Sequence, residues 1–141
     1  MIDVVDPATR SRMMSGIRGK DTKPELLVRK YLHAQGLRFR LHVKNLPGKP
    51  DIVFSKYRAI VFVHGCFWHH HAGCKYATMP SSRVDYWMNK LSDNAARDQY
   101  QSAALEGLGW RVFVIWECEL QQGSTKRLEW LYSEIIKGID T

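Results

Sequence analysis

The run Ala59-Ile60-Val61-Phe62-Val63 lies near the middle of the 141-residue chain and decides its fold. Consecutive apolar residues rich in β-branched side chains are typical of a central strand that is covered on both faces. Upstream, residues 52–54 are predicted to form a short strand after a turn at residues 46–50. Residues 37–43 alternate basic and apolar side chains, which indicates a half-buried strand with a basic outer face.

Helices are predicted on both sides of these strands. Thr22 and Glu25 form a capping box that begins a helix, and Gln35-Gly36 ends it. The core face of this helix is predicted to contain its apolar residues: Leu26, Leu27, Tyr31 and Leu32. Ser82 is predicted to cap a long helix that ends near residue 105, followed by a second buried strand at 110–116 and an amphipathic helix at 127–136. With a short helix at about residues 6–17, this order predicts one α/β domain with a mixed central β-sheet flanked by helices.

The composition is that of a globular protein, with 45% hydrophobic and 25% charged residues. No apolar run approaches the ~20 residues that a membrane-spanning helix needs. The N-terminus carries charges where a signal peptide would be apolar, so we expect a cytoplasmic location. The sequence holds no heptad pattern, and we expect a monomer.

The formal net charge of +7 is concentrated in the first third of the chain. Residues 1–50 carry eleven Lys and Arg against four Asp and Glu, whereas residues 51–141 carry ten of each sign. Such a lopsided field favours a polyanion such as DNA as partner. A solvated basic arm without a partner fits the charge equally well.

The three cysteines of the chain, an odd number, argue against a disulfide framework and suit metal ligation. Cys66, His71 and Cys74 lie within nine residues, and Cys118 follows the last predicted core strand. Three thiolates and one imidazole make a closed structural zinc site of the Cys₃His type. On spacing alone His69 or His70 could replace His71, and the alternative for the cysteines is burial as free thiols.

Asp51 stands between a turn and a strand, where sheet-based nucleases hold a catalytic magnesium ion. Nucleases of the PD-(D/E)xK type usually place an acid and a lysine on the next strand, but residues 59–63 offer neither. An active site here would therefore need a main-chain carbonyl as a metal ligand and another base, for which the downstream histidines are candidates. The alternative is that Asp51 is an ordinary turn residue.

Aromatic residues form a third signal. Phe67 and Trp68 lie inside the cysteine-rich loop, and Trp87 lies on the long helix with Lys90 and Asn94 on the same face. Rigid apolar side chains beside a basic surface can wedge between the base steps of DNA. The alternative is packing in a core, which periodicity favours for Trp87 and leaves open for the other two.

Together these motifs resemble the very-short-patch-repair (Vsr) mismatch endonucleases, in order along nearly the whole chain. The resemblance is carried by Asp3-Val4, Asp6, Ala8-Thr9-Arg10-Ser11, Met14, Leu46-Pro47-Gly48-Lys49-Pro50-Asp51, His64-Gly65-Cys66-Phe67-Trp68-His69-His70-His71, Trp110-Arg111-Val112 and Val114-Ile115-Trp116-Glu117-Cys118. It implies a restriction-endonuclease-like fold, a PD-(D/E)xK variant with a structural zinc site. It also implies magnesium-dependent nicking of double-stranded DNA 5′ to the thymine of a T:G mismatch, within the recognition site of a companion cytosine methylase.

The resemblance also implies roles for individual residues. Asp51 and the carbonyl of Val63 would hold magnesium, His69 would be the general base, Glu25 would support this base or a water at the metal, and His64 would lie near the scissile phosphate. The implied zinc ligands are Cys66, His71, Cys74 and Cys118. The implied DNA wedge is Phe67, Trp68 and Trp87 from the major groove and Met14 from the minor groove, with Lys90 and Asn94 facing the mismatched bases.

Residues 1–18 are expected to be a DNA-binding arm that is mobile without DNA, and residues 19–141 the endonuclease domain. Mismatch-repair proteins and a repair polymerase are the implied partners. The loop is one residue longer before Cys74 than the spacing typical of the family. Gly73 lets the turn adjust around zinc, but the sequence preference around the mismatch is less secure. The alternatives are a general mismatch nickase or restriction-type nuclease of the same fold, a non-catalytic zinc-stabilised DNA-binding module, and a purely structural protein.

Overall fold

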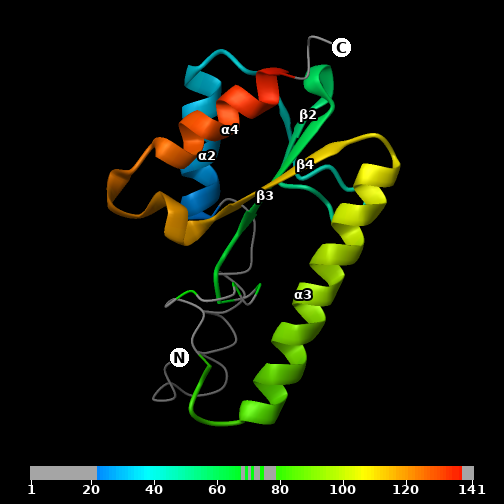
Figure 1. The fold of residues 1–141 in the computed structure, drawn as a ribbon, viewed down its shortest axis with the longest axis vertical. Helices are drawn as coiled ribbons and strands as arrows, with labels where there is room; N and C mark the ends of the chain where they lie inside the picture. Colours follow the sequence, from blue (N-terminus) through cyan, green and yellow to red (C-terminus); the bar gives the residue numbers. More distant parts are fainter. Residues whose placement is uncertain (1–21, 68, 70, 72–73, 75–78, 138–141) are drawn as a thin grey trace.

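The computed structural model describes residues 22–67, 69, 71, 74 and 79–137 (Figure 1). The predicted arm at residues 1–18, with its helix and Met14, lies outside the described residues, as do Trp68 and His70. Among the described residues, the helices are all too short or too polar to cross a membrane.

A mixed four-stranded sheet forms the centre of the fold, in the order β1-β2-β3-β4. The strands are β1 (Arg40–Leu41), β2 (Ile52–Phe54), β3 (Ala59–His64) and β4 (Arg111–Trp116). β2 pairs antiparallel with both β1 and β3, whereas β4 pairs parallel with β3, which confirms the predicted mixed sheet. The predicted strand at 37–43 is reduced to two residues, because His42 adopts a left-handed backbone (φ +48°) that interrupts the strand.

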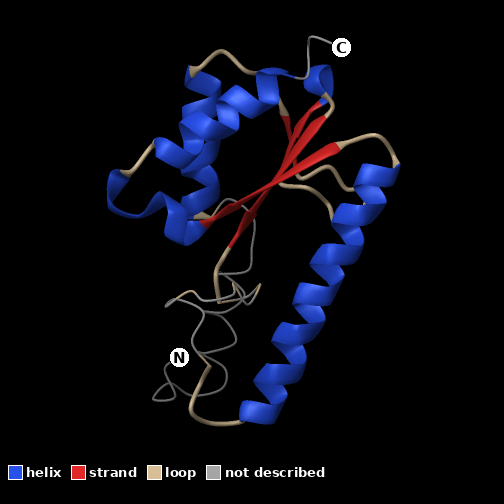
Figure 2. Ribbon diagram, in the orientation of Figure 1, coloured by secondary structure: helices blue, strands red, loops and turns tan. Residues whose placement is uncertain are grey.

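Both faces of β2 and β3 are covered, as the apolar run predicts. Alternate residues point to opposite faces, so Ile52 and Val61 pack in one core cluster while Val53 and Ile60 pack in another. The first cluster includes residues of α2 (Lys23–Ala34) and α4 (Lys126–Ile136), which lie together on one side of the sheet (Figure 2). The second includes Leu105 near the end of α3 (Val84–Gly107), on the other side.

Helix α2 begins where the capping box predicts, with the Thr22 hydroxyl accepting a hydrogen bond from the Glu25 N–H. Its predicted core face is wrong for Leu26 and Leu27, which are 46% and 42% exposed. The buried residues are Glu25, Val28 and Leu32, a stripe at i, i+3 and i+7. The helix is therefore turned so that a carboxylate, rather than two leucines, faces the interior.

Two further predictions need correction. Ser82 does not cap α3, because the N-cap is Arg83, which has a left-handed backbone and makes no side-chain capping bond. β4 is not a fully buried strand: it is last in the strand order, and of its six residues only Ile115 is buried. Helix α4 forms as predicted and buries Leu128, Leu131 and Ile135.

The long helix α3 extends well beyond the strands (Figure 1). Phe67, three residues after the end of β3, contacts Trp87 in the first turn of α3. The end of β3 and the first half of α3 therefore frame one region of the molecule, and the candidate site residues gather there.

Candidate active site and metal centre

Asp51 precedes β2 directly, and its carboxylate is fixed against the end of β3. Its Oδ2 accepts a hydrogen bond from the Val63 N–H at 2.8 Å. Burial raises the pKa of Asp51 to about 6, because a buried carboxylate loses hydration. The Val63 N–H opposes this rise, the nearby Glu25 carboxylate adds to it, and His42 and His69 lower it. Asp51 is thus a partly buried carboxylate whose ionised form is destabilised by lost hydration.

Glu25, His42 and Asp51 bring their ligand atoms within 4.8 Å of one another, and we call them the carboxylate cluster. Glu25 is only 2% exposed, and its Oε2 lies 2.8 Å from Nε2 of His42 and 3.2 Å from a guanidinium nitrogen of Arg29. The His42 N–H donates to the Asp51 carbonyl at 3.0 Å. A buried and a partly buried carboxylate whose oxygens lie this close together are a donor set that suits a hard divalent cation.

A second group lies at the start of the loop after β3. The His69 ring lies with Nδ1 2.5 Å from Oδ2 of Asp98 on α3, and it stacks on His64 with 3.7 Å between ring centroids and 6° between planes. With the proton on Nδ1, His69 donates to Asp98, and Nε2 keeps a lone pair that can accept a proton. This arrangement fits the general base predicted at His69.

His64 ends β3 as a buried, neutral imidazole. It is 6% exposed, and burial lowers its pKa to about 3, with His69 lowering it further. Its Nδ1 has no hydrogen-bond partner in the part of the chain that the structure describes. His64, His69 and Asp98 also bring their ligand atoms close together. However, the two imidazole rings are stacked in nearly parallel planes, so their nitrogen lone pairs do not converge on one ion.

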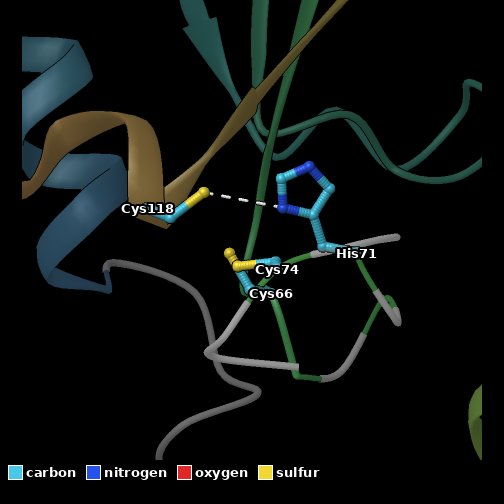
Figure 3. A group of neighbouring side chains, drawn as sticks. All are labelled: Cys66, His71, Cys74 and Cys118. Atoms are coloured by element: carbon cyan, nitrogen blue, oxygen red, sulfur yellow. Dashed lines mark hydrogen bonds between the residues drawn. The ribbon is translucent and has the colours of Figure 1, made fainter. Parts of the chain in front are cut away.

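The four predicted zinc ligands assemble as the spacing suggests, and we call them the cysteine centre: Cys66, His71, Cys74 and Cys118. Their side chains converge from the loop after β3 and from η2 (Glu117–Gly123), the 3₁₀ helix that follows β4 (Figure 3). All four donor atoms lie within 4.8 Å of one another. A tetrahedral zinc–thiolate site has sulfur–sulfur edges of about 3.8 Å, so this donor set fits a metal ion.

The loop is folded so that these ligands face inward. The His71 N–H donates to the Cys66 carbonyl, and the Cys74 N–H donates to the His71 carbonyl, which makes two successive turns. The His71 ring stacks on Trp116 with 4.0 Å between centroids, and its Nδ1 lies 3.5 Å from the Cys118 sulfur. Burial raises the pKa of the Cys66 thiol to about 12 and also raises that of Cys118. The thiols are therefore protonated at neutral pH unless a cation favours the thiolates.

His71, rather than His69, belongs to the cysteine centre, because the His69 ring is held by Asp98. Two residues that sequence reasoning missed are His42 and Asp98. The alternation of residues 37–43 placed His42 among outward-facing basic side chains. Asp98 could have been predicted from the sequence, because it lies four residues after Asn94 and therefore on the same helical face as Trp87 and Asn94.

A family model described as DNA mismatch endonuclease Vsr matches residues 2–75. The chain belongs to this family. The DNA mismatch endonuclease Vsr of Escherichia coli is 42% identical over 142 residues, covering 95% of this chain and 90% of that protein. The type II nicking enzyme V.XorIIP of Xanthomonas oryzae pv. oryzae is 54% identical over 120 residues, covering 85% of this chain and 88% of the relative. V.NmeAIP of Neisseria meningitidis, also named a type II nicking enzyme, is 45% identical over 141 residues, covering 99% and 100%.

The aromatic residues implied as a DNA wedge in the Vsr family are only partly described. Trp87 is 5% exposed and packs with Leu91, while Phe67 and Met79 contact this pair. Trp87 thus occupies a small core at the start of α3, as its periodicity indicates. The wedge role stays a prediction for these aromatics.

Proposed function

We propose that this member of the Vsr family nicks one strand of double-stranded DNA 5′ to the thymine of a T:G mismatch. The observation that carries the proposal is the position of Asp51, a partly buried carboxylate anchored to the end of β3 by the Val63 N–H. Glu25 and His69 lie near enough to shift its pKa, which supports a single reaction site made of the carboxylate cluster and the histidine pair. The domain would be a variant of the restriction-endonuclease-like fold.

The carboxylate cluster fits a magnesium ion, for which Asp51 and the Val63 carbonyl would be the protein ligands. When bound, this ion would stabilise negative charge on the phosphate and on the leaving oxygen. The raised pKa of Asp51 supports this assignment, because a cation would offset the cost of keeping the carboxylate ionised in a buried position.

In this proposal His69 accepts the proton of the attacking water through Nε2, while Asp98 holds the ring in the required tautomer. His64 stacks on His69 and fixes the plane of its ring. Because His64 stays neutral at physiological pH, it would meet the phosphate as an uncharged imidazole. Glu25 would support this base or orient a water at the metal.

The cysteine centre is proposed to hold a structural zinc ion. Its four protein donors leave no position open for substrate, which is typical of a structural rather than a catalytic zinc site. Cys66 follows His64 by two residues, so a metal ion there would also fix the start of the segment that carries His69. Zinc would in this way support the geometry of the base without taking part in the reaction.

DNA recognition is assigned to the residues around the first half of α3 and to the arm at residues 1–18. Phe67, Trp68, Trp87 and Met14 would open the base stack, with Lys90 and Asn94 facing the mismatch. Replacing Trp68 by Ala should weaken discrimination between mismatched and matched duplexes by about 1–3 kcal/mol, the cost of one lost base–aromatic contact. Competition binding with the two duplexes measures this, and equal losses on both would contradict the wedge.

The decisive experiment uses purified protein, magnesium and end-labelled duplexes that carry T:G, each other mispair or none, in several sequence contexts. A nick 5′ to the mismatched thymine in one context supports the proposal. Nicking at many mispairs would favour the general nickase, and binding without any nick in zinc-loaded protein would favour the non-catalytic module. Asp51→Asn serves as the control for a contaminating nuclease.

A further inference from the structure

His42 stands between the two acidic residues of the carboxylate cluster and bonds to both. Its backbone N–H donates to the carbonyl of Asp51 at 3.0 Å, and its Nε2 lies 2.8 Å from Oε2 of Glu25. We propose that His42 is a positioning residue of the nicking reaction, which fixes the Glu25 carboxylate beside Asp51. This inference rests on the function proposed above and assigns a role to a third residue of the same site.

The first argument is that the two acids come from separate parts of the fold. Glu25 lies in the first turn of α2, whereas Asp51 precedes β2. The backbone bond ties His42 to the Asp51 segment, and the side-chain bond reaches across to the helix. His42 thereby sets how the Glu25 carboxylate lies relative to Asp51.

The second argument is electrostatic. The ligand atoms of Glu25 and Asp51 lie within 4.8 Å of each other, and two negative charges at this distance repel. Without the bond to His42, this repulsion would turn the Glu25 carboxylate away from Asp51, while Arg29, one helical turn further on, could still bind it. Within the part of the chain that the structure describes, the bonds of this carboxylate to Arg29 and to His42 both use Oε2. This arrangement leaves Oε1 for a cation or a water.

The third argument is the backbone of His42, which adopts φ +48°. A residue other than glycine in this region costs on the order of 1 kcal/mol and persists where surrounding contacts over-determine it. Here the bonds to Asp51 and Glu25 are such contacts. The alternative that His42 itself ligates the cation is disfavoured, because its Nε2 already lies at hydrogen-bond distance from Glu25.

The test compares His42→Gln with His42→Met in the full-length, zinc-loaded protein. The two side chains are similar in length and volume, but only Gln carries an N–H donor that can replace Nε2 of the imidazole. We expect His42→Met to lower the saturating nicking rate about 10- to 100-fold with KM within about threefold, since it removes an interaction needed in the transition state. We expect His42→Gln to stay within about threefold of the parental rate, as one donor replaces another. His33→Gln, at an exposed position of α2, is the matched control.

A second readout does not depend on nicking. Binding of Mn²⁺ to the DNA-free protein, followed by calorimetry, should weaken about tenfold in His42→Met and stay parental in His42→Gln, because Mn²⁺ prefers the same oxygen ligands as Mg²⁺. Equal losses in the two variants, whether of rate, Mn²⁺ binding or melting temperature, would overturn the proposal and leave His42 a packing residue. If the parental protein nicks no mismatched duplex, the proposed function fails, and Mn²⁺ binding alone decides the role of His42.

Discussion

The carboxylate cluster and the cysteine centre lie close to the same end of β3 but are held in different ways. Glu25 and Asp51 are fixed by hydrogen bonds from His42, Arg29 and the Val63 N–H, so this cluster is organised by the protein itself. The cysteine centre depends on turns within a loop, and burial raises the pKa values of two of its thiols. The carboxylate cluster is organised before a cation binds. The cysteine centre, in contrast, needs a cation to stabilise its thiolates.

The difference separates what each metal site is expected to do. A preorganised cluster keeps its geometry when the cation leaves, so the ion can be exchanged during catalysis at little structural cost. A loop whose ligands gain their charge only on binding couples metal affinity to folding. Metal removal should therefore inactivate the first site and unfold the second region, and each of the following experiments tests one side of this contrast.

The largest effect is expected from Asp51→Asn. Removing the charged ligand should lower the nicking rate by about 10³-fold or more, as for other losses of charge stabilisation at a phosphate. Zinc content and binding to mismatched DNA should stay parental, because neither depends on this carboxylate. Single-turnover assays and gel-shift titrations measure the two quantities, and a nicking rate within tenfold of parental would remove Asp51 from the mechanism.

The same substitution should raise stability at neutral pH. Because burial raises the pKa of Asp51 from 3.8 to about 6, the folded state favours the protonated form. The charge therefore costs stability above pH 6, on the order of 1–3 kcal/mol, and costs nothing below about pH 3, where folded and unfolded states are both protonated. Chemical denaturation of the metal-free variant should show a gain at pH 7.5 that shrinks as the pH falls and disappears near pH 3. A loss of stability at pH 7.5 would contradict the burial argument.

The next effect concerns the cysteine centre. Cys118→Ala should reduce zinc to well below one equivalent and lower the melting temperature by about 10 °C or more, since structural zinc contributes directly to folding energy. Nicking should be lost along with the structure of the loop. Elemental analysis and thermal melting report the outcome. A variant that melts like the parental protein would show that the cysteines are buried free thiols.

The next comparison is between the proposed base, His69, and Asp98, which holds its ring. His69→Ala should lower the nicking rate about 10²- to 10⁴-fold, the range for a lost general base. Asp98→Asn, which keeps a hydrogen-bond acceptor for Nδ1 but removes the charge, should cost less, about 10-fold. Both variants should bind DNA and zinc normally. If Asp98→Asn cost as much as His69→Ala, the carboxylate would be more than a guide for the ring.

The sequence predicted the cysteine centre better than the carboxylate cluster, and the reason is physical. Metal ligands in a short loop leave a spacing signal, and Cys66, His71 and Cys74 do come together with Cys118. The burial of Glu25 depends on His42, which lies 17 residues away in the chain, and no local pattern encodes that contact.

The apolar run of β3 likewise predicted its own burial and the mixed sheet around it. The orientation of α2 could not be assigned from the positions of its leucines, because the helix turns its acid inward and leaves Leu26 exposed. A prediction from apolar periodicity fails where a polar group occupies the interior, as Glu25 does at the carboxylate cluster.

The smallest effect is the pH dependence of cation binding to the carboxylate cluster. Asp51 must be ionised to bind a cation, and its pKa is raised to about 6, so Mn²⁺ affinity should fall about tenfold per pH unit below pH 6 and level off above pH 7. Calorimetric titration of DNA-free protein between pH 5 and 8 measures this, with Asp51→Asn as the non-binding control. An affinity that stays constant down to pH 5 would mean that Asp51 is already fully ionised there. His42 and His69 would then lower the pKa of Asp51 by more than burial raises it. In that case the carboxylate cluster would be ionised before a cation binds, unlike the thiols of the cysteine centre.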